Sequence, residues 1–131
     1  VYVACISLGA NPQTTIKVLN EAEKYNGPSL IIAYAPCIAQ GILKGMKNSI
    51  MEEKNATESG YFPIFHYNPE TGIFKMDSKA DFSNYKEFLL GEDRYKSLDK
   101  LNRNAKELLA ENLNNAKERY NNYKSLETKE K

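Results

Sequence analysis

Two short apolar runs with a helical stretch between them make up the start of the chain. Residues 1–8 are nearly all β-branched, aromatic or small and apolar, a composition typical of a strand buried on both faces. Residues 29–35 form a second apolar strand, closed by Pro36. A strand, a helix and a strand within about 35 residues constitute a βαβ unit. We therefore predict an α/β fold, a parallel-sheet βαβ fragment.

The predicted helix has clear signals at both ends. Asn11 is a favourable N-cap residue, and Pro12 suits the first helical position because its missing N–H would be unpaired there. The helix is expected to run to about Tyr25 and to end at Gly27, which would adopt the left-handed conformation common after a helix. The residues predicted to share one side are Ile16, Leu19, Ala22 and Glu23, with Val18 and Tyr25 flanking them.

A second helix is predicted directly after Cys37. Leu43, Met46 and Ile50 recur at helical spacing, and the pattern ends at residues 59–60. Two glycines, at positions 41 and 45, weaken the first turns and would let the backbone approach a neighbour closely. Cys37 would then lie between the carboxyl end of a strand and the start of a helix.

A hairpin and a helix are predicted next. Residues 61–67 read as a third strand, in which Pro63 removes a ladder donor, so the strand lies at an edge or enters the sheet late. Residues 68–72 form a turn, and residues 73–76 return as a short strand. Ser83 is expected to cap a helix that carries Tyr85, Phe88 and Leu89.

A long polar helix is predicted from about Leu98 to Lys124, after a break near Gly91. Its apolar stripe comprises Leu101, Ala105, Leu108, Leu109, Leu113, Ala116, Tyr120 and Tyr123. At this length such a stripe more often docks on another surface than forms a coiled coil. We therefore expect residues 98–131 to be a C-terminal helical extension of an α/β domain formed by residues 1–97.

Composition and charge exclude several function classes. The 131 residues carry a formal net charge of +1, and charges of both signs are mixed along the chain. No basic block tracks a phosphate backbone, so we expect no nucleic-acid partner. No apolar run is long enough to span a bilayer, and no signal segment opens the chain. With only two cysteines, these features favour a reducing, cytoplasmic location and no membrane partner.

The two cysteines and the single histidine have the most specific chemistry. A complete metal or iron–sulfur site needs about four ligands, more than these three residues supply. Cys5 lies within a strand, where a small buried thiol is the usual role. Cys37 would precede a helix N-terminus, which favours a metal-binding thiolate, but the residues alone favour a structural thiol. His66 lies in an aromatic strand with no acidic residue nearby in sequence to orient it, so a partly buried packing role is expected.

Several segments of the chain resemble pyruvate:ferredoxin (flavodoxin) oxidoreductases. They are residues 1–10 (VYVACISLGA), 21–38 (EAEKYNGPSLIIAYAPCI), 41–46, 59–65, 67–69, 77–79, 87–89 and 94–95. The match covers roughly residues 1–100 in collinear order, and the last helix matches only in character. The resemblance implies that residues 1–97 are the later part of a thiamine-diphosphate-binding domain, near the C-terminus of a multidomain chain.

The resemblance also implies a chemistry for the full-length enzyme. In this family pyruvate is decarboxylated on thiamine diphosphate, which is bound with magnesium, and coenzyme A accepts the acetyl group. Electrons pass singly through [4Fe–4S] clusters to ferredoxin or flavodoxin. The position matching Cys37 is the fourth cysteine ligand of the cluster nearest the thiamine, and its three partners lie upstream. We accordingly expect no catalytic residue in this chain, a homodimer for the full-length enzyme, and no activity for the segment alone.

Parts of the family pattern are missing from the chain. The thiamine–magnesium motif, which starts Gly-Asp-Gly, and the other three cluster cysteines are not in the sequence, so we expect this chain alone to hold neither cofactor. Val1 begins inside a strand, which also suggests a piece of a longer protein. Ala39 stands where the family often has a polar residue, and His66 where arginine is common. Two alternatives stay open: a stand-alone α/β interaction module with structural cysteines, and a related 2-oxoacid:ferredoxin oxidoreductase.

Overall fold

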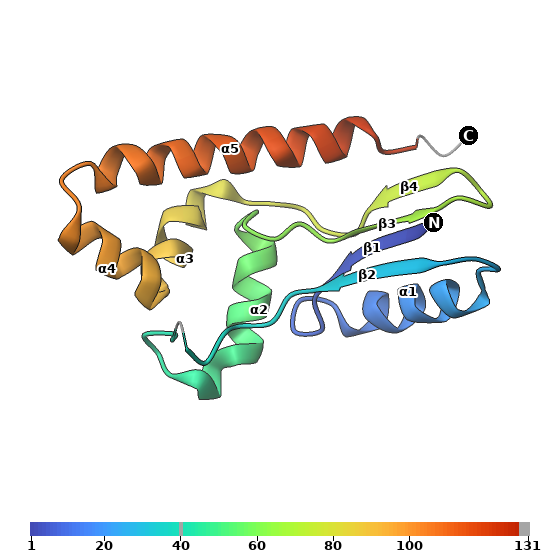
Figure 1. The fold of residues 1–131 in the computed structure, drawn as a ribbon, viewed down its shortest axis with the longest axis horizontal. Coiled ribbons are helices and arrows are strands. Elements are labelled where there is room, and N and C mark those ends of the chain that lie inside the picture. Colours follow the sequence, from blue (N-terminus) through green and yellow to red (C-terminus); the bar gives the residue numbers. More distant parts are fainter. Residues whose placement is uncertain (40, 129–131) are drawn as a thin grey trace.

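The computed structural model describes residues 1–39 and 41–128, which form a four-stranded sheet joined at one end to a helical part (Figure 1). The strands are β1 (Tyr2–Ile6), β2 (Ser29–Ala33), β3 (Phe65–Asn68) and β4 (Ile73–Met76). The α-helices are α1 (Pro12–Lys24), α2 (Ser49–Glu58), α3 (Tyr85–Gly91), α4 (Asp93–Leu101) and α5 (Ala105–Ser125), and the 3-10 helices are η1 (Met46–Asn48) and η2 (Phe82–Asn84). α1 and α5 lie on opposite sides of the sheet, and α2, α3 and α4 lie beyond the end of β1 and β2 (Figure 1).

The sheet has the order β2-β1-β3-β4 and is mixed. β1 and β2 are parallel, with Tyr2 opposite Ser29 and Ile6 opposite Ala33, which confirms the βαβ unit and the α/β class. β3 runs antiparallel to both β1 and β4. The parallel pairing inferred from the apolar run of residues 1–8 therefore holds on one side of β1 only, because its other neighbour comes from the β3–β4 hairpin.

α1 begins as predicted, but a different side of it is buried. Asn11 is the N-cap, and its Oδ1 accepts a hydrogen bond of 3.0 Å from a backbone N–H of the first turn. Val18 and Thr15 are buried, whereas Ile16 and Leu19 are 59% and 45% exposed. The prediction is therefore wrong for Ile16 and Leu19, whereas Ala22 packs against the core as expected. Val18 packs with Tyr2, Ala4 and Ile6 of β1, and the hydroxyl of Thr15 can be buried because it donates to the Asn11 carbonyl at 2.9 Å.

The end of α1 also differs from the prediction. The C-cap residue Tyr25 is extended (φ −66°, ψ 125°), and Gly27 is not among the glycines with positive φ. Gly27 is needed for space instead: a Cβ at this position would lie 2.7 Å from the Tyr25 ring. The chain thus reaches β2 through extended backbone and a close aromatic contact rather than through a left-handed glycine.

β2 lies at one edge of the sheet and is largely exposed. Leu30 and Ile32 are 51% and 45% exposed, and Ile31 packs beneath α1. The strand ends at Ala33, and Tyr34 N adds one further hydrogen bond, of 3.0 Å, to Ile6 O of β1. Among the described residues, β2 has no strand on its outer side.

The β3–β4 hairpin forms the other half of the sheet. β3 starts at Phe65, after Pro63, so the strand enters the sheet late as the proline indicated, and it lies between β1 and β4 rather than at an edge. The segment after α5 covers part of the outer edge of β4: Phe74 N donates to Thr128 Oγ1 at 3.0 Å, and Met76 N donates to Glu127 Oε1 at 3.3 Å.

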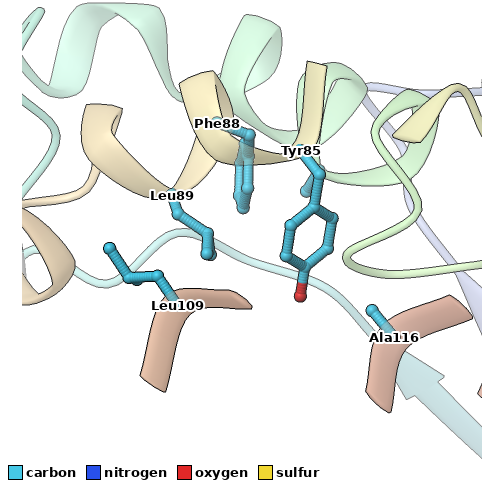
Figure 2. Packing of buried hydrophobic residues seen from close by; sticks show 6 residues of the cluster. Tyr85, Phe88, Leu89, Leu109 and Ala116 are labelled. Atoms are coloured by element: carbon cyan, nitrogen blue, oxygen red, sulfur yellow. The ribbon is translucent and has the colours of Figure 1, made fainter. Parts of the chain in front are cut away.

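A hydrophobic core joins α2, α3 and α5 (Figure 2). Its buried members are Ala56, Tyr85, Phe88, Leu89, Leu109 and Ala116. These include the apolar residues predicted for α3. The cap predicted at Ser83 is wrong, because the side chain of Asp81 accepts the hydrogen bond from Ser83 N, at 3.0 Å, and caps η2. This core holds α2 against α3, and both helices border the loop that contains Cys37.

The long helix predicted from Leu98 to Lys124 is two helices. α4 ends at Leu101, which is 86% exposed, and α5 begins at Ala105. Between them Asn102 is extended, and its Oδ1 accepts a hydrogen bond of 2.8 Å from Asn104 N, a local bond that competes with helix formation. The predicted stripe is confirmed within α5, where Ala105, Leu109 and Ala116 are buried, while Leu108 is 42% exposed. In the described ranges, no helix combines the length and apolarity that crossing a membrane requires.

Candidate functional site

Cys37 lies in an exposed loop beyond the parallel strands. We call residues 34–39 and 41–45 the Cys37 loop; they follow Ala33, the last residue of β2, and the Cys37 side chain is exposed with a free thiol. The helix predicted directly after Cys37 is wrong, because α2 begins only at Ser49. A helix N-terminus therefore does not act on this thiol. Its availability to a ligand follows from its exposure instead.

Two glycines explain why the helical pattern after Cys37 fails. Gly41 and Gly45 have φ values of 73° and 85°, in the left-handed region that cannot continue a right-handed helix. Leu43 and Ile50, although spaced as in a helix, are 47% and 59% exposed. The spacing of the apolar residues was thus compatible with a helix, and the backbone conformation of the glycines decides against it.

The junction between α3 and α4 holds the Cys37 loop in place. Ile42 is buried and forms an isolated antiparallel bridge with Glu92. Leu43 N donates to Gly91 O at 3.0 Å on one side of this bridge. Nearer the cysteine, Gly41 N donates to Cys37 O at 3.1 Å. The position of Cys37 therefore depends on a segment more than fifty residues further along the chain.

Replacing Gly41 with alanine is expected to loosen the Cys37 loop more than the same change at Gly45. Both substitutions force a side chain into left-handed backbone, at a cost of about 1–2 kcal/mol. A Cβ at Gly41 would also collide with the Asp93 carboxylate, whereas Gly45 has open space around it. Amide hydrogen exchange of residues 41–45 in the full-length protein measures both effects. Equal protection in the two variants would contradict the contact with Asp93.

Aromatic side chains surround the base of the Cys37 loop. The Tyr34 ring contacts Tyr61 edge-on at 6.3 Å between centroids, and it lies 5.2 Å from Phe62. Tyr61 in turn shares a hydrogen bond of 2.9 Å with the Tyr95 hydroxyl. Arg94 donates to the Tyr61 hydroxyl at 2.8 Å, and its guanidinium lies 4.9 Å from the centre of the Tyr95 ring. The group therefore combines stacking, hydrogen bonding and a cation–π contact.

The tyrosines of this group stay protonated. Burial raises the pKa of Tyr34, and the nearby carboxyl groups of Glu92 and Glu52 raise it further. Burial is also the main cause of the raised pKa of Tyr61, assisted by its hydrogen bond to Tyr95. These hydroxyls therefore serve as neutral hydrogen-bonding groups and do not act as bases at physiological pH.

A cavity of about 610 Å³ opens beside the Cys37 loop, between α2 and α3. The loop contributes Ile42, Leu43 and Lys44 to its wall, and α2 contributes Glu52, a buried carboxyl group. Sequence reasoning did not single out Glu52 or its buried neighbour Glu92. Their only signal was the presence of acidic residues in otherwise amphipathic helical segments, which does not distinguish buried acids from exposed ones.

Cys5 lies in β1, paired with Ile32 on one side and Phe65 on the other. The residue is half-buried and its thiol is free. Burial raises the pKa of the Cys5 thiol to about 11, so the thiol is protonated at neutral pH. A protonated thiol is a poor metal ligand, and these properties fit a packing role.

His66 is oriented by acidic residues, contrary to the prediction. It is buried, with Nδ1 2.6 Å from Asp77 Oδ2 and Nε2 3.8 Å from Glu21 Oε2. Tyr2 donates to the same Glu21 oxygen at 3.1 Å. The partners are distant in sequence: the hairpin returns Asp77 to His66, and the βαβ crossover places Glu21 above it. Both ring nitrogens face carboxylates, so the imidazole links α1 to the hairpin.

The described residues do not assemble a complete metal site. Within residues 1–39 and 41–128, no group of three or more His, Cys, Asp or Glu side chains could hold a metal ion. Ala39, beside Cys37 in the loop, is exposed and brings no ligand. An exposed thiol on an anchored loop can, however, serve as one ligand of a site that other residues complete. Cys37 has this property and Cys5 does not.

Comparison with known proteins identifies relatives of the whole chain, although no family model matches it. The chain is 46% identical over 132 residues to the pyruvate:ferredoxin oxidoreductase of Moorella thermoacetica, an alignment covering 96% of this chain and 11% of the relative. It is 42% identical to the pyruvate-flavodoxin oxidoreductase of Enterobacter agglomerans, with the same two coverages of 96% and 11%. It is 37% identical to the mitochondrial pyruvate dehydrogenase [NADP(+)] of Euglena gracilis, over 96% of this chain and 7% of the relative.

These relatives confirm the resemblance to pyruvate:ferredoxin (flavodoxin) oxidoreductases. The chain spans about a tenth of the length of the curated relatives that it matches. The similarity extends through the helical end of the chain, which the resemblance had matched only in character.

Proposed function

We propose that this chain is the segment of a pyruvate:ferredoxin (flavodoxin) oxidoreductase that supplies Cys37 as one ligand of a [4Fe–4S] cluster. The full-length enzyme would oxidise pyruvate to acetyl-CoA and carbon dioxide and pass the electrons to ferredoxin or flavodoxin. The observation that carries this proposal is the sequence identity of 46% over nearly the whole chain to one segment of such an enzyme.

The properties of Cys37 fit an iron–sulfur ligand. Clusters of this kind are held by cysteine thiolates, usually four of them. Cys37 offers an exposed free thiol beyond the carboxyl ends of a parallel strand pair, where α/β proteins often bind ligands. The other three ligands would come from outside the described residues, which hold no group able to bind a metal alone. A bound cluster would supply one-electron transfer at this position.

The role of the other residues is to hold Cys37 in a fixed position. The bridge between Ile42 and Glu92 anchors the Cys37 loop, and the core of α2, α3 and α5 supports the helices next to that bridge. Tyr34 and Tyr61 pack at the base of the loop and limit its movement. Rigid placement matters because electron transfer depends steeply on the distance between cofactors.

Thiamine diphosphate and magnesium would bind outside this chain. Within the described ranges no acidic cluster suits a magnesium ion, and the motif expected for the cofactor is not in the sequence. We therefore assign no residue here to them. Pyruvate, coenzyme A and the electron acceptor would likewise meet the rest of the oxidoreductase chain, which we propose to be a homodimer. The division into residues 1–97 and 98–131 stays a prediction. In the structure, α4 runs across the boundary between the two parts.

A related oxidoreductase with a different acceptor or substrate is the second candidate. The Euglena gracilis relative, which aligns with 96% of this chain, is named for NADP(+) rather than for ferredoxin or flavodoxin. The same segment therefore occurs in enzymes named for different electron acceptors.

The full-length protein, purified without oxygen, provides the test. It is expected to contain iron and acid-labile sulfide, and to reduce ferredoxin or flavodoxin only when pyruvate, coenzyme A and thiamine diphosphate are all present. Parallel assays with another 2-oxoacid and with NADP(+) examine the second candidate. A protein without iron and without pyruvate-dependent electron transfer would contradict the proposal.

A further inference from the structure

Two acidic residues that are distant in sequence meet in the interior beside the Cys37 loop. Glu52 comes from α2 and Glu92 from the α3–α4 junction, and they are 7% and 3% exposed. A hydrogen bond between the two side chains is one of the causes that raise the pKa of Glu52. The Oε1 atom of each is buried and, within the part of the chain that the structure describes, has no donor group as a hydrogen-bond partner. Two buried carboxylates in contact repel each other, so this arrangement is stable only if one proton lies between them.

The surrounding charges decide which carboxyl group keeps the proton. Arg94 of α4 forms an ion pair with Glu92, with its Nε 3.7 Å from Glu92 Oε2. Lys44 of the Cys37 loop favours ionisation of Glu52, but burial, the hydrogen bond to Glu92 and the negative charge of Glu92 oppose it. Tyr34, which interacts electrostatically with both acids, stays neutral. Glu52 is therefore the acid that holds the proton.

The same two residues connect Cys37 to the helical core. The backbone of Glu92 forms the bridge with Ile42, and the Gly41 N–H bonds to the Cys37 carbonyl. The carboxyl group of Glu92 interacts with that of Glu52 on α2. The connection thus runs from α2 through the acid pair and the bridge to the Cys37 loop.

We propose that Glu52 and Glu92 share one proton, and that this hydrogen bond fastens the Cys37 loop to α2, so that loss of the proton loosens the loop. The two acids are then positioning residues for Cys37. Their relevance to electron transfer rests on the proposed function, whereas the fastening itself does not.

The pH dependence of the loop follows from the direction in which the environment shifts the pKa of Glu52. The pKa of Glu52 is raised to about 7, chiefly by burial. The proton is therefore in place below this pH, and the fastening is lost as the pH rises through about 7. Above that range both carboxylates are charged, and their repulsion acts directly on the bridge between Glu92 and Ile42.

Hydrogen exchange in the full-length protein tests the proposal. After correction for the intrinsic dependence of exchange on pH, residues 41–45 should exchange about tenfold faster at pH 8 than at pH 6, since each pH unit above the pKa changes the ratio of ionised to protonated acid tenfold. Glu52→Gln should remove this dependence and keep the protection, because an amide N–H can donate to Glu92 at every pH. Glu58→Gln, a control on the same helix whose side chain is 60% exposed, should behave as the wild type.

Two results would overturn the proposal. One is a wild-type loop whose corrected exchange does not change between pH 6 and pH 8, and the other is a Glu52→Gln variant that retains the wild-type dependence. If Glu52→Gln does not fold, Glu92→Gln serves in its place, since it also supplies a permanent donor to the other acid. The readout is backbone exchange, so it stands even if Cys37 proves not to bind iron.

A second readout separates positioning from mere stability. In the iron-loaded enzyme, the electron paramagnetic resonance signal of the reduced clusters should vary with pH through the same range in the wild type and not in Glu52→Gln. A signal that varies equally in both proteins would contradict a positioning role. An iron content that is unchanged in Cys37→Ser would contradict the proposed function, but it would not affect the interpretation of the hydrogen-exchange result.

Discussion

Cys37→Ser in the full-length oxidoreductase is expected to remove one cluster from the protein and to reduce pyruvate-dependent ferredoxin reduction by about 100-fold or more. Loss of residues that merely support a metal ligand already costs 10- to 100-fold, so loss of the ligand itself should cost at least as much. Serine has a similar size but a harder oxygen donor, which iron–sulfur clusters bind poorly compared with thiolate. Iron analysis and the electron-transfer rate measure the result.

Cys5→Ser is the matched control, because Cys5 is the only other cysteine in the chain. The residue is half-buried within β1, and its protonated thiol is suited to packing. Iron content and the rate of electron transfer should therefore stay at the wild-type level. Unchanged iron in Cys37→Ser, or equal losses in the two variants, would contradict the assignment of Cys37 as a ligand.

The second large effect is expected at His66. His66→Ala would leave the Asp77 carboxylate, whose side chain is 8% exposed, without its partner at 2.6 Å. Leaving a buried polar group without its hydrogen-bond partner costs about 1–3 kcal/mol, and more for a charged group. The free energy of opening measured by native-state hydrogen exchange at β1 and β3 should fall by this amount. His66→Gln, which keeps one N–H donor, should lose less.

Lys17→Ala provides a control that involves the same network. Lys17 forms an ion pair of 3.7 Å with Glu21 on the surface of α1, and its side chain is 58% exposed. Exposed pairs contribute about 0–1 kcal/mol, so the opening free energy should hardly change. If Lys17→Ala destabilised the sheet as much as His66→Ala, burial would not be the reason for the importance of His66.

Features set by neighbouring residues were predictable from the sequence. The N-cap at Asn11, the turn before β4 and the late start of β3 after Pro63 all depend on local backbone chemistry. The βαβ unit combines such signals, and it has the predicted order and pairing. Local signals also placed Cys37 after the second strand, where the structure has it.

Features that depend on distant contacts were not predictable in the same way. The buried side of α1 is set by the rings and methyl groups of β1, so Val18 is buried and Ile16 is not. The segment after Cys37 is spaced like a helix, but its glycines adopt left-handed backbone and its bridge partner, Glu92, lies far along the chain.

The buried pairs Glu52–Glu92 and His66–Asp77 escaped sequence reasoning for a related reason. Glu52 meets Glu92, and His66 meets Asp77, only after the helices and the hairpin have packed. A charged residue in a sequence is normally assumed to be solvated, because most such residues are exposed. Only the fold shows which of them are enclosed.

The two edges of the sheet differ in how they would behave toward other protein molecules. The outer side of β4 already donates backbone hydrogen bonds to the side chains of Glu127 and Thr128, which leaves it a poor template for a further strand. β2 has no such cover among the described residues, and it carries the exposed side chains of Leu30 and Ile32. Exposed apolar edges of this kind promote aggregation. When the segment is produced apart from a longer chain, self-association should therefore begin at β2, and the solubility of an isolated version should depend on polar substitutions there.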